Sequence, residues 1–382
     1  MKRLTVITKE YPAPGEPVYP FVEQLVNAMA DFSVQVTVVQ PVNPLRRLAK
    51  GGKVPPTREI RPTAQGHAVT ILRPRFVSFG GRDIGPFRPA MWTLAAYRCA
   101  AERAIDALPE KPEALYGHFV FPSGLSAAEI GQKMNIPSFL AYGESTVKLF
   151  SGIPKAEIVR RLAHLSGVVA VSGENAREIV ADGYYPRAEH VQVFPNAVDP
   201  ARFHPMDRAK AREKLNLPQD AFIVSFVGGF IARKGVKVLC RALDEAGTSS
   251  VFIGRGDEAP DAKGMLFAGA LDHEKIPEYL AASDVFALPT LNEGCCNAIV
   301  EALAMGLPVI SSDLPFNDGL LTAENSLRID PADVKQVAGA IARLRDDPAL
   351  RARLAKGAKQ TGAALEIGAR ASGILKFMEE RL

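Results

Sequence analysis

Cysteine is scarce in this sequence, and long apolar runs are absent. The 382 residues include only four cysteines, with no C-x-x-C pair and no metal-ligand spacing, so we expect neither a disulfide framework nor a zinc site. No stretch reaches the roughly 18 to 20 apolar residues of a spanning helix, and we expect neither membrane anchor nor signal peptide. A D-x-D pair that could hold a divalent cation on a diphosphate is also missing. These absences predict a cytoplasmic protein with no bound metal and no cofactor.

The composition is that of a folded globular protein. Hydrophobic residues make up 47% and charged residues 23% of the chain, which excludes a disordered or fibrous protein. A chain of 382 residues exceeds the size at which a single hydrophobic core usually keeps growing. Two domains are therefore expected.

Short β-branched runs alternate with amphipathic stretches along the whole chain, which is typical of parallel sheets with helical crossovers. The fold class is therefore α/β. The segment Pro195–Gln219 is rich in proline and polar residues and separates two such series. The expected strands are Leu4–Lys9, Val34–Gln40, Val69–Arg73, Ala114–Gly117, Ser138–Tyr142, Val168–Val171, Val191–Phe194, Phe222–Val227, Ser250–Ile253, Met265–Ala268, Val285–Leu288, Pro308–Ser311 and Ser326–Ile329.

Positive charge is concentrated in the first half of the chain. Residues 41–100 contain eleven basic side chains and only two acidic ones, although the net charge of the whole chain is only +4. A solvated basic face explains this excess, and so does an anionic membrane surface or a phosphorylated acceptor. Nucleic acid is not expected, because no recognition module accompanies the charge. Within this region Pro41–Pro62 has no clear period and is predicted to be a long loop.

The most informative stretch contains two glutamates, Glu293 and Glu301. A strand ends near Pro289, and Asn297 is placed to cap a helix that stops at Gly306. Glu293 is then in a loop at the carboxyl end of a strand, where ligands bind in open α/β sheets, and Glu301 is in the following helix. Two carboxylates there can accept hydrogen bonds from sugar hydroxyls. From spacing alone, a capping acid and a surface acid explain the pair as well.

Residues 293–301 resemble the E-x7-E signature of the large retaining glycosyltransferase family four, and residues 302–310 resemble its continuation. Other parts match in the same order. Residues 226–235 resemble the family's donor-phosphate loop, residues 282–289 the strand before the signature, and residues 193–205 the interdomain stretch. The resemblance is strong over the second half of the chain and looser over the first.

This resemblance implies the GT-B fold, in which two Rossmann-like doubly wound parallel-sheet domains face each other across a cleft. Residues 1–197 are then the acceptor-binding domain and residues 198–359 the donor-binding domain. A C-terminal helix within residues 360–382 is expected to pack back on the first domain.

The resemblance also implies roles for individual residues. Glu293 is expected to contact the transferred sugar as a catalytic residue, and Glu301 the ribose. Lys234 corresponds to the lysine that neutralises the donor diphosphate, at the start of a helix. The remaining donor-site candidates lie between the two glutamates or in the first loop of the chain: Gly294, Cys295, Cys296, Asn297 and Gly15.

Two features depart from the family pattern. Gly229 stands where many members have an arginine, so one phosphate contact is missing. Arg233 is a candidate substitute, although neighbouring helical residues point about 100° apart and so need not converge. Cys295 and Cys296 replace an aromatic or aliphatic residue and a small one, and we interpret the thiols as small buried hydrophobes rather than nucleophiles. A Walker A loop is excluded, since residues 229–235 lack the Gly-Lys-Ser/Thr ending.

The first half of the chain contributes further candidates at strand ends. Residues 116–124 resemble the family's strand-end histidine followed by a Pro-x-Gly helix start, so His118 is a catalytic candidate. Glu144 and Ser145 end the next strand on the same edge and are candidates for contact with the acceptor.

Taken with the resemblance, these residues predict a metal-independent retaining glycosyltransferase of the hexosyltransferase class. It would move a sugar from a nucleotide-diphosphate sugar to a glycan or polyprenyl-phosphate-linked acceptor, in surface polysaccharide or glycolipid synthesis at the inner face of the membrane. Two alternatives stay open: a nucleotide-sugar epimerase or hydrolase on the same plan, and a non-catalytic nucleotide-sugar binding subunit.

Overall fold

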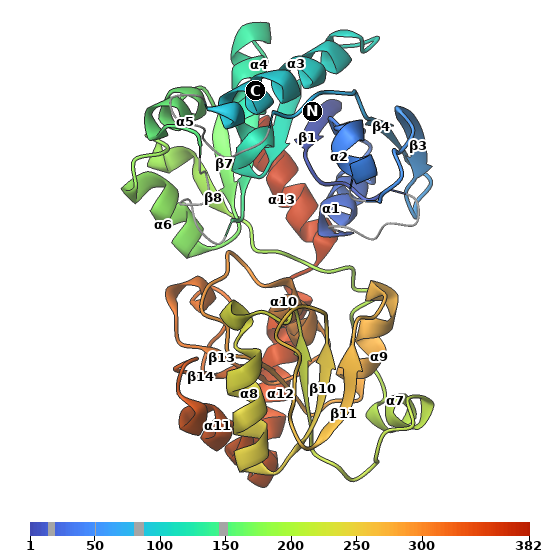
Figure 1. Ribbon diagram of the computed structural model, residues 1–382, viewed down its shortest axis with the longest axis vertical. Helices are drawn as coiled ribbons and strands as arrows, with labels where there is room; N and C mark the ends of the chain where they lie inside the picture. The colour runs from blue at the N-terminus through green and yellow to red at the C-terminus, as the bar shows by residue number, and fades with distance from the viewer. Residues whose placement is uncertain (14–19, 50, 80–87, 145–151) are drawn as a thin grey trace. The chain divides into compact units, whose positions relative to one another are not determined.

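A computed structural model of the protein describes residues 1–13, 20–49, 51–79, 88–144 and 152–382. By its internal contacts the chain divides into two units, which Figure 1 shows with their elements labelled. Unit 1 consists of residues 1–194 and 370–382, and unit 2 of residues 195–369. None of the helices in the described part of the chain is long and apolar enough to cross a membrane.

Unit 1 is built on an eight-stranded sheet in the order β3-β4-β2-β1-β5-β6-β7-β8. All neighbouring strands pair in parallel except β3, which is antiparallel to β4. The strands are β1 (Arg3–Thr8), β2 (Gln35–Val39), β3 (Arg58–Pro62), β4 (Ala68–Leu72), β5 (Ala114–His118), β6 (Ser138–Tyr142), β7 (Gly167–Ala170) and β8 (Val191–Val193).

Helices connect the strands of unit 1 and cover its sheet. Helices α3, α4 and α5 pack side by side, whereas α1 packs on β2 and β4. The helices are α1 (Pro20–Ala30), α2 (Pro44–Ala49), α3 (Pro89–Asp106), α4 (Leu125–Met134), α5 (Lys155–Leu162), α6 (Gly173–Ala181) and α13 (Ile367–Glu379). The central strands β5 and β6 are buried throughout, as a sheet covered on both faces requires.

Unit 2 contains a six-stranded parallel sheet in the order β11-β10-β9-β12-β13-β14. Its strands are β9 (Ile223–Val227), β10 (Ser249–Ile253), β11 (Met265–Gly269), β12 (Val285–Leu288), β13 (Val309–Ser312) and β14 (Ser326–Ile329). The helices are α7 (Arg208–Lys214), α8 (Val236–Ala246), α9 (Ile276–Ala281), α10 (Asn297–Ala304), α11 (Val334–Asp346) and α12 (Pro348–Ala363).

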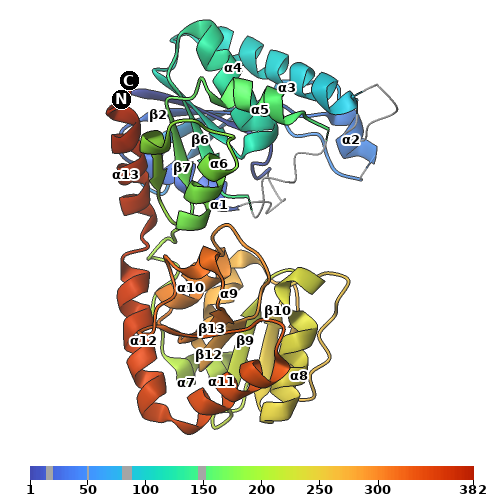
Figure 2. The same cartoon turned by 90° about the vertical axis from the view of Figure 1, so that its left-hand side faces the viewer.

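Helices cover both faces of this second sheet. Helix α8 packs against α11, and α10 packs against α12. In Figure 2 the strands of unit 2 lie between α8 on one side and α12 on the other. The sequence of α8 explains its position, because Val236, Leu239, Cys240 and Leu243 follow the i, i+3, i+4, i+7 spacing and are all buried.

Every expected strand is present within one residue at each end. The long loop predicted over Pro41–Pro62 is wrong, because α2 and the edge strand β3 lie inside it. No residue of α2 is buried, and β3 is at least partly exposed along its length, so neither element produces a hydrophobic period.

Polar contacts fix β3 instead of apolar packing. The Glu59 carboxylate is paired with the guanidinium groups of Arg61, at 2.5 Å, and Arg73, at 2.7 Å. Arg61 also pairs with Glu23 of α1 at 2.6 Å. Arg73 is completely buried and donates to Gln40. Part of the positive charge counted between residues 41 and 100 is therefore neutralised inside unit 1.

The last helix, α13, packs within unit 1. Its Phe377 ring makes edge contacts with Phe139 of β6 and with Phe194, both at 6.0 Å between centroids. The amino group of Met1 lies 2.5 Å from Glu379 near the end of the same helix. Both ends of the chain therefore belong to one unit, as Figure 1 shows.

Candidate active site

Each sheet has one point at which the order of strand addition reverses. In unit 2 it lies between β9 and β12, and in unit 1 between β1 and β5. Loops that leave the carboxyl ends of two such strands diverge, and the crevice between them is where open α/β sheets bind ligands. Residues 228–234 follow β9 and residues 289–296 follow β12, so the candidate donor residues lie at the switch point of unit 2.

Three charged side chains meet at this switch point. The Glu293 Oε1 atom lies 2.5 Å from the Lys234 Nζ and 2.9 Å from an Arg233 guanidinium nitrogen. It also accepts a hydrogen bond of 2.8 Å from the Thr290 hydroxyl. Only 11% of the Glu293 side chain and 13% of the Lys234 side chain are exposed, so water screens this pair little.

The expectation that Arg233 and Lys234 need not converge is wrong. Residues Ala232–Lys234 form a 3-10 turn ahead of α8 rather than part of the α-helix, and Glu293 lies within reach of both cations. The turn ends at Gly235, whose φ of +69° favours glycine. A Cβ atom there would lie 2.2 Å from the Pro289 carbonyl oxygen. Gly235 therefore lets the loop after β12 approach the start of α8.

Lys234 is also next to a buried thiol. Its Nζ atom lies 3.9 Å from the Cys296 Sγ. Burial alone would lower the pKa of Lys234, but the Glu293 carboxylate outweighs it, so the pKa is raised. Burial raises the pKa of the Cys296 thiol. Lys234 is therefore a cation and Cys296 a neutral thiol near pH 7.

A side chain from the interdomain stretch holds the loop between the two glutamates. The Asn196 amide nitrogen donates to the Cys295 carbonyl at 3.0 Å and to the Asn297 Oδ1 at 2.7 Å. The Asn196 backbone N–H donates to the Cys295 sulfur at 3.4 Å. Asn297 is therefore not the helix cap that the sequence predicts: α10 begins at Asn297, and Cys296 takes the cap position.

The second glutamate has a partner that sequence reasoning missed. The Glu301 Oε1 atom lies 2.8 Å from the His273 Nε2, and the His273 Nδ1 lies 3.0 Å from an Arg202 guanidinium nitrogen. His273 begins a 3-10 turn shortly after β11, at the same edge of the sheet as Glu293. Its place just past the carboxyl end of a strand is the signal that could have revealed it.

In unit 1 the switch point is occupied by His118, the last residue of β5, which pairs with Thr8 of β1. The imidazole is buried, and its Nδ1 has no hydrogen-bond partner in the described part of the chain. Burial, with a smaller contribution from Arg370, lowers the pKa of His118 to about 3, so the ring is neutral at physiological pH. The following residue, Phe119, has a φ of +70°, which is unusual for a side chain of this size.

Glu144 follows β6, next to His118's strand in the sheet. Its carboxylate accepts hydrogen bonds from the backbone N–H groups of Val120, at 2.6 Å, and Gly143, at 3.2 Å. Burial raises the pKa of Glu144 to about 7. The carboxyl group therefore braces the turn that follows His118. Gly15 and Ser145 lie outside the described residues.

Comparison with known proteins identifies this arrangement. Residues 207–361, which make up most of unit 2, match the family model for glycosyl transferases group 1. The match assigns this part of unit 2 to that family. Glu293, Glu301 and Lys234 all lie inside the matched region.

Curated glycosyltransferases resemble this chain over different shares of its length. TuaC of Bacillus subtilis, described as a teichuronic acid biosynthesis glycosyltransferase, is 27% identical over 88% of this chain and 87% of its own length. The lipopolysaccharide core biosynthesis glycosyltransferase LpsD of Rhizobium meliloti is 34% identical over 40% of this chain and 47% of its own. The D-inositol 3-phosphate glycosyltransferase of Acidothermus cellulolyticus is 31% identical over 54% of this chain and 50% of its own length.

Solved structures show that the chain has the GT-B fold, built from two Rossmann-like units. Sucrose-phosphate synthase from Thermosynechococcus elongatus has a TM-score of 0.76 with 18% identity, covering 100% of this chain and 99% of its own. HepE of Anabaena in complex with UDP has a TM-score of 0.73 with 16% identity, and the match covers all of both chains. These low identities establish the fold alone.

Gly229, where the sequence lacks the expected arginine, lies beside the backbone of Arg255. Arg255 follows β10, and its carbonyl accepts the Phe230 N–H at 2.9 Å, which places residue 255 beside residue 229. A Cβ atom at Gly229 would lie 4.0 Å from that same carbonyl oxygen. The backbone of Arg255 therefore lies beside Gly229, and residue 255 is exposed.

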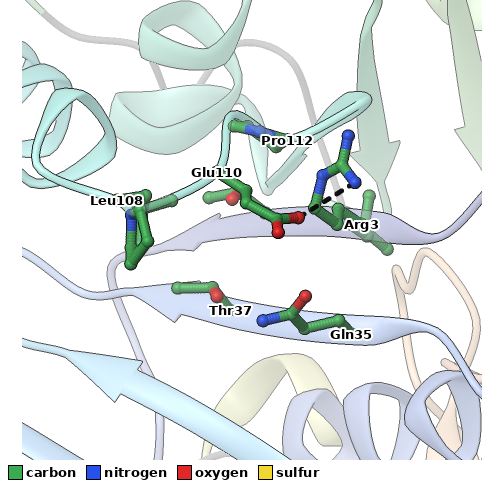
Figure 3. A pocket seen from close by; sticks show the side chains of 9 residues that line it. Arg3, Gln35, Thr37, Leu108, Glu110 and Pro112 are labelled. Atoms are coloured by element: carbon green, nitrogen blue, oxygen red, sulfur yellow. Dashed lines mark hydrogen bonds and ion pairs between the residues drawn. The ribbon is translucent and has the colours of Figure 1, made fainter.

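A separate pocket in unit 1 lies at the other edge of its sheet. Arg3 and Gln35 begin β1 and β2, so this pocket is at the amino ends of the strands (Figure 3). The Arg3 guanidinium, which Figure 3 shows reaching Glu110, lies 3.1 Å from Glu110 and 3.3 Å from Glu113. Its charge is already neutralised, and the edge is opposite to the one where doubly wound sheets bind ligands.

Proposed function

We propose that this protein is a retaining glycosyltransferase whose unit 2 binds a nucleotide-diphosphate sugar. The observation that carries the proposal is the Glu293–Lys234 pair at the switch point of unit 2. Glu293 faces the transferred sugar and Glu301 the ribose, with the backbone of Gly294, Cys295, Cys296 and Asn297 around the donor. In unit 1, His118 is the second catalytic residue. Gly15 contacts the donor in this proposal, and Glu144 and Ser145 contact the acceptor.

The paired charges suit the separation of charge during transfer. As the bond between the sugar and the diphosphate breaks, the sugar becomes cationic and the leaving group gains negative charge. The Glu293 carboxylate stabilises the first and the Lys234 ammonium the second, with Arg233 beside it. The acceptor hydroxyl oxygen bonds to the anomeric carbon on the face that the diphosphate leaves, and the leaving phosphate takes the hydroxyl proton, so the anomeric configuration is retained. Lys234 supplies the charge that a D-x-D motif would provide through a metal, so we propose a metal-independent reaction.

Product analysis with a panel of nucleotide sugars tests this function. We expect one donor to raise the melting temperature and to be consumed only when an acceptor is added, with the same rate in EDTA as in magnesium. Turnover abolished by EDTA and restored by magnesium or manganese would contradict metal independence. Consumption of the donor when no acceptor is present would indicate a hydrolase or epimerase. Donor binding without turnover on any acceptor would indicate a non-catalytic subunit.

The acceptor is proposed to be a glycan or polyprenyl-phosphate-linked sugar in surface polysaccharide or glycolipid synthesis. The biosynthetic roles in the names of TuaC and LpsD support this proposal. Such acceptors are reached at the inner face of the membrane, so we propose a cytoplasmic enzyme that associates peripherally with anionic lipid.

The surface around α2 and the start of α3 supports the membrane proposal. Contacts join these elements, because Val42 pairs with Arg75 and the Phe79 N–H donates to the Thr93 hydroxyl. Large apolar side chains are exposed here: Leu45 (67%), Leu48 (60%), Val77 (54%), Phe79 (50%) and Trp92 (58%). Exposed basic residues accompany them: Arg46, Lys53 and Arg88. Aromatic and leucine side chains beside positive charge suit the interface of an anionic bilayer.

Trp92 makes this membrane association directly measurable, since it is the only tryptophan in the sequence. Vesicles containing phosphatidylglycerol should shift its fluorescence to shorter wavelength. Raising the salt concentration should reverse the shift, because exposed charges are screened beyond about 10 Å at 0.1 M salt. The Arg46→Glu variant should respond less at every lipid concentration. An unchanged spectrum, or an equal shift with neutral phosphatidylcholine vesicles, would contradict the proposal.

A further inference from the structure

We infer that His273 is a positioning residue for ribose recognition, and that Arg202 sets its tautomer. The inference rests on the proposed donor site, because it assigns to Glu301 the ribose hydroxyls. It concerns two side chains that the E-x7-E signature does not include.

Hydrogen-bond chemistry fixes the protonation of His273. A guanidinium group has donors and no acceptor, so the His273 Nδ1 must accept the 3.0 Å bond from Arg202. The ring proton is then on Nε2, which donates the 2.8 Å bond to the Glu301 Oε1. The Phe203 ring packs on the imidazole at 5.3 Å between centroids and limits its rotation. His273 is thus held by hydrogen bonds at both ring nitrogens and by the Phe203 ring.

The contact with His273 leaves the second carboxylate oxygen of Glu301 available to a ligand, in a fixed orientation. Glu301 is 6% exposed, and its Oε2 makes no hydrogen bond to any residue that the structure describes. With Oε1 held by His273, Oε2 faces a fixed direction and can accept from the vicinal 2′ and 3′ hydroxyls of a ribose. Without His273 the carboxylate would have to be ordered when the nucleotide binds, which weakens binding.

Arg202 and Phe203 both come from the interdomain stretch, as does Asn196. Their backbone N–H groups both donate to the Asp199 carbonyl, so a compact turn presents the two side chains together. The same stretch therefore reaches both parts of the signature. Asn196 contacts the loop after Glu293, and Arg202 contacts His273, which in turn contacts Glu301.

Calorimetry with ribose and deoxyribose ligands tests the inference. The probes are UDP, GDP and ADP, each beside its 2′,3′-dideoxy form. For the diphosphate that binds the wild-type protein, His273→Ala should weaken the ribonucleotide by about tenfold and the dideoxy form by less than about twofold. His273→Gln should restore most of the loss, since a Gln amide also provides one donor and one acceptor. His204→Ala is the matched control, because His204 is exposed and its Nδ1 lies 3.2 Å from the Pro200 carbonyl oxygen.

The outcomes separate this inference from the proposed function. Equal loss for ribose and dideoxyribose forms, or no loss for either, would overturn the role of His273 while leaving the donor site intact. Failure of the wild-type protein to bind any of the diphosphates would instead refute the donor site itself. As an independent readout, the 15N spectrum of His273 should show an unprotonated Nδ1, and Arg202→Ala should allow both tautomers. An Nδ1–H tautomer in the wild-type protein would also overturn the inference.

Discussion

Replacing Glu293 with Gln should lower the rate constant of sugar transfer about a hundredfold to a thousandfold, while affinity for the free diphosphate stays within about threefold. Glutamine keeps the shape of the side chain and can still accept the hydrogen bonds from Thr290 and Arg233. Only the negative charge is lost, and that charge matters most as the sugar becomes cationic. Lys234 keeps its own charge and remains available to the diphosphate.

Single-turnover transfer rates and calorimetric affinity for the diphosphate measure this effect. Glu301→Ala is the matched comparison on the same stretch, and it should show the opposite pattern. Loss of the ribose contact should weaken both the diphosphate and the full donor by about 1.5 to 3 kcal/mol. If Glu293→Gln abolished diphosphate binding, or Glu301→Ala retained it, the two roles would be wrongly assigned. If neither variant changed anything, the pair would be a structural feature of the loop and helix.

Lys234→Met should weaken diphosphate binding by about tenfold to a hundredfold, the range expected for a charge-assisted hydrogen bond. It should also reduce transfer, because the leaving group loses its nearest cation and Glu293 keeps only Arg233 as a partner. Lys237→Met is the control. Lys237 is the second residue of α8, close to Lys234 in the sequence, but it is exposed and pairs with Asp261. It should bind and transfer like the wild-type protein.

A double-mutant cycle shows whether Lys234 and Glu293 act as a unit. Side chains in direct contact are coupled by about 0.5 to 3 kcal/mol, so the combined Lys234→Met and Glu293→Gln variant should lose less activity than the two separate losses predict. Strict additivity would mean that the two side chains act independently in transfer. Wild-type affinity in Lys234→Met would show that other groups, such as Arg255, hold the diphosphate.

The sequence predicted the strands well because they are buried runs of β-branched and aromatic residues. Strands β9 and β12 are buried along their whole length, and such runs have few alternative structures. The edge strand β3 was missed because the Glu59, Arg61 and Arg73 side chains fix it, and ion pairs leave no period in the sequence. The hydrophobic pattern of the sequence therefore predicts buried strands better than edge strands that are held by ion pairs.

The candidate site was partly predictable for a related reason. The carboxyl ends of strands are readable from the sequence, and the structure has His118 and Glu293 at or just after such ends. Contacts between distant segments are not readable in this way. Asn196 reaches Cys295 across 99 positions, and Arg202 reaches His273 across 71. Side chains that act on a site from elsewhere in the chain become visible only when the fold brings them together.

The course of the chain through the two units affects how the protein could be engineered. The backbone passes from one unit to the other twice, between residues 194 and 195 and between residues 369 and 370. Unit 2 is therefore a single continuous insert, whereas unit 1 needs its distant C-terminal helix to be complete. A chimera that exchanges donor specificity should transplant residues 195–366 and keep the recipient's own last helix, which begins at Ile367. A chimera joined once in the middle would pair a foreign α13 with Phe139 and Phe194, and we expect it to fold poorly.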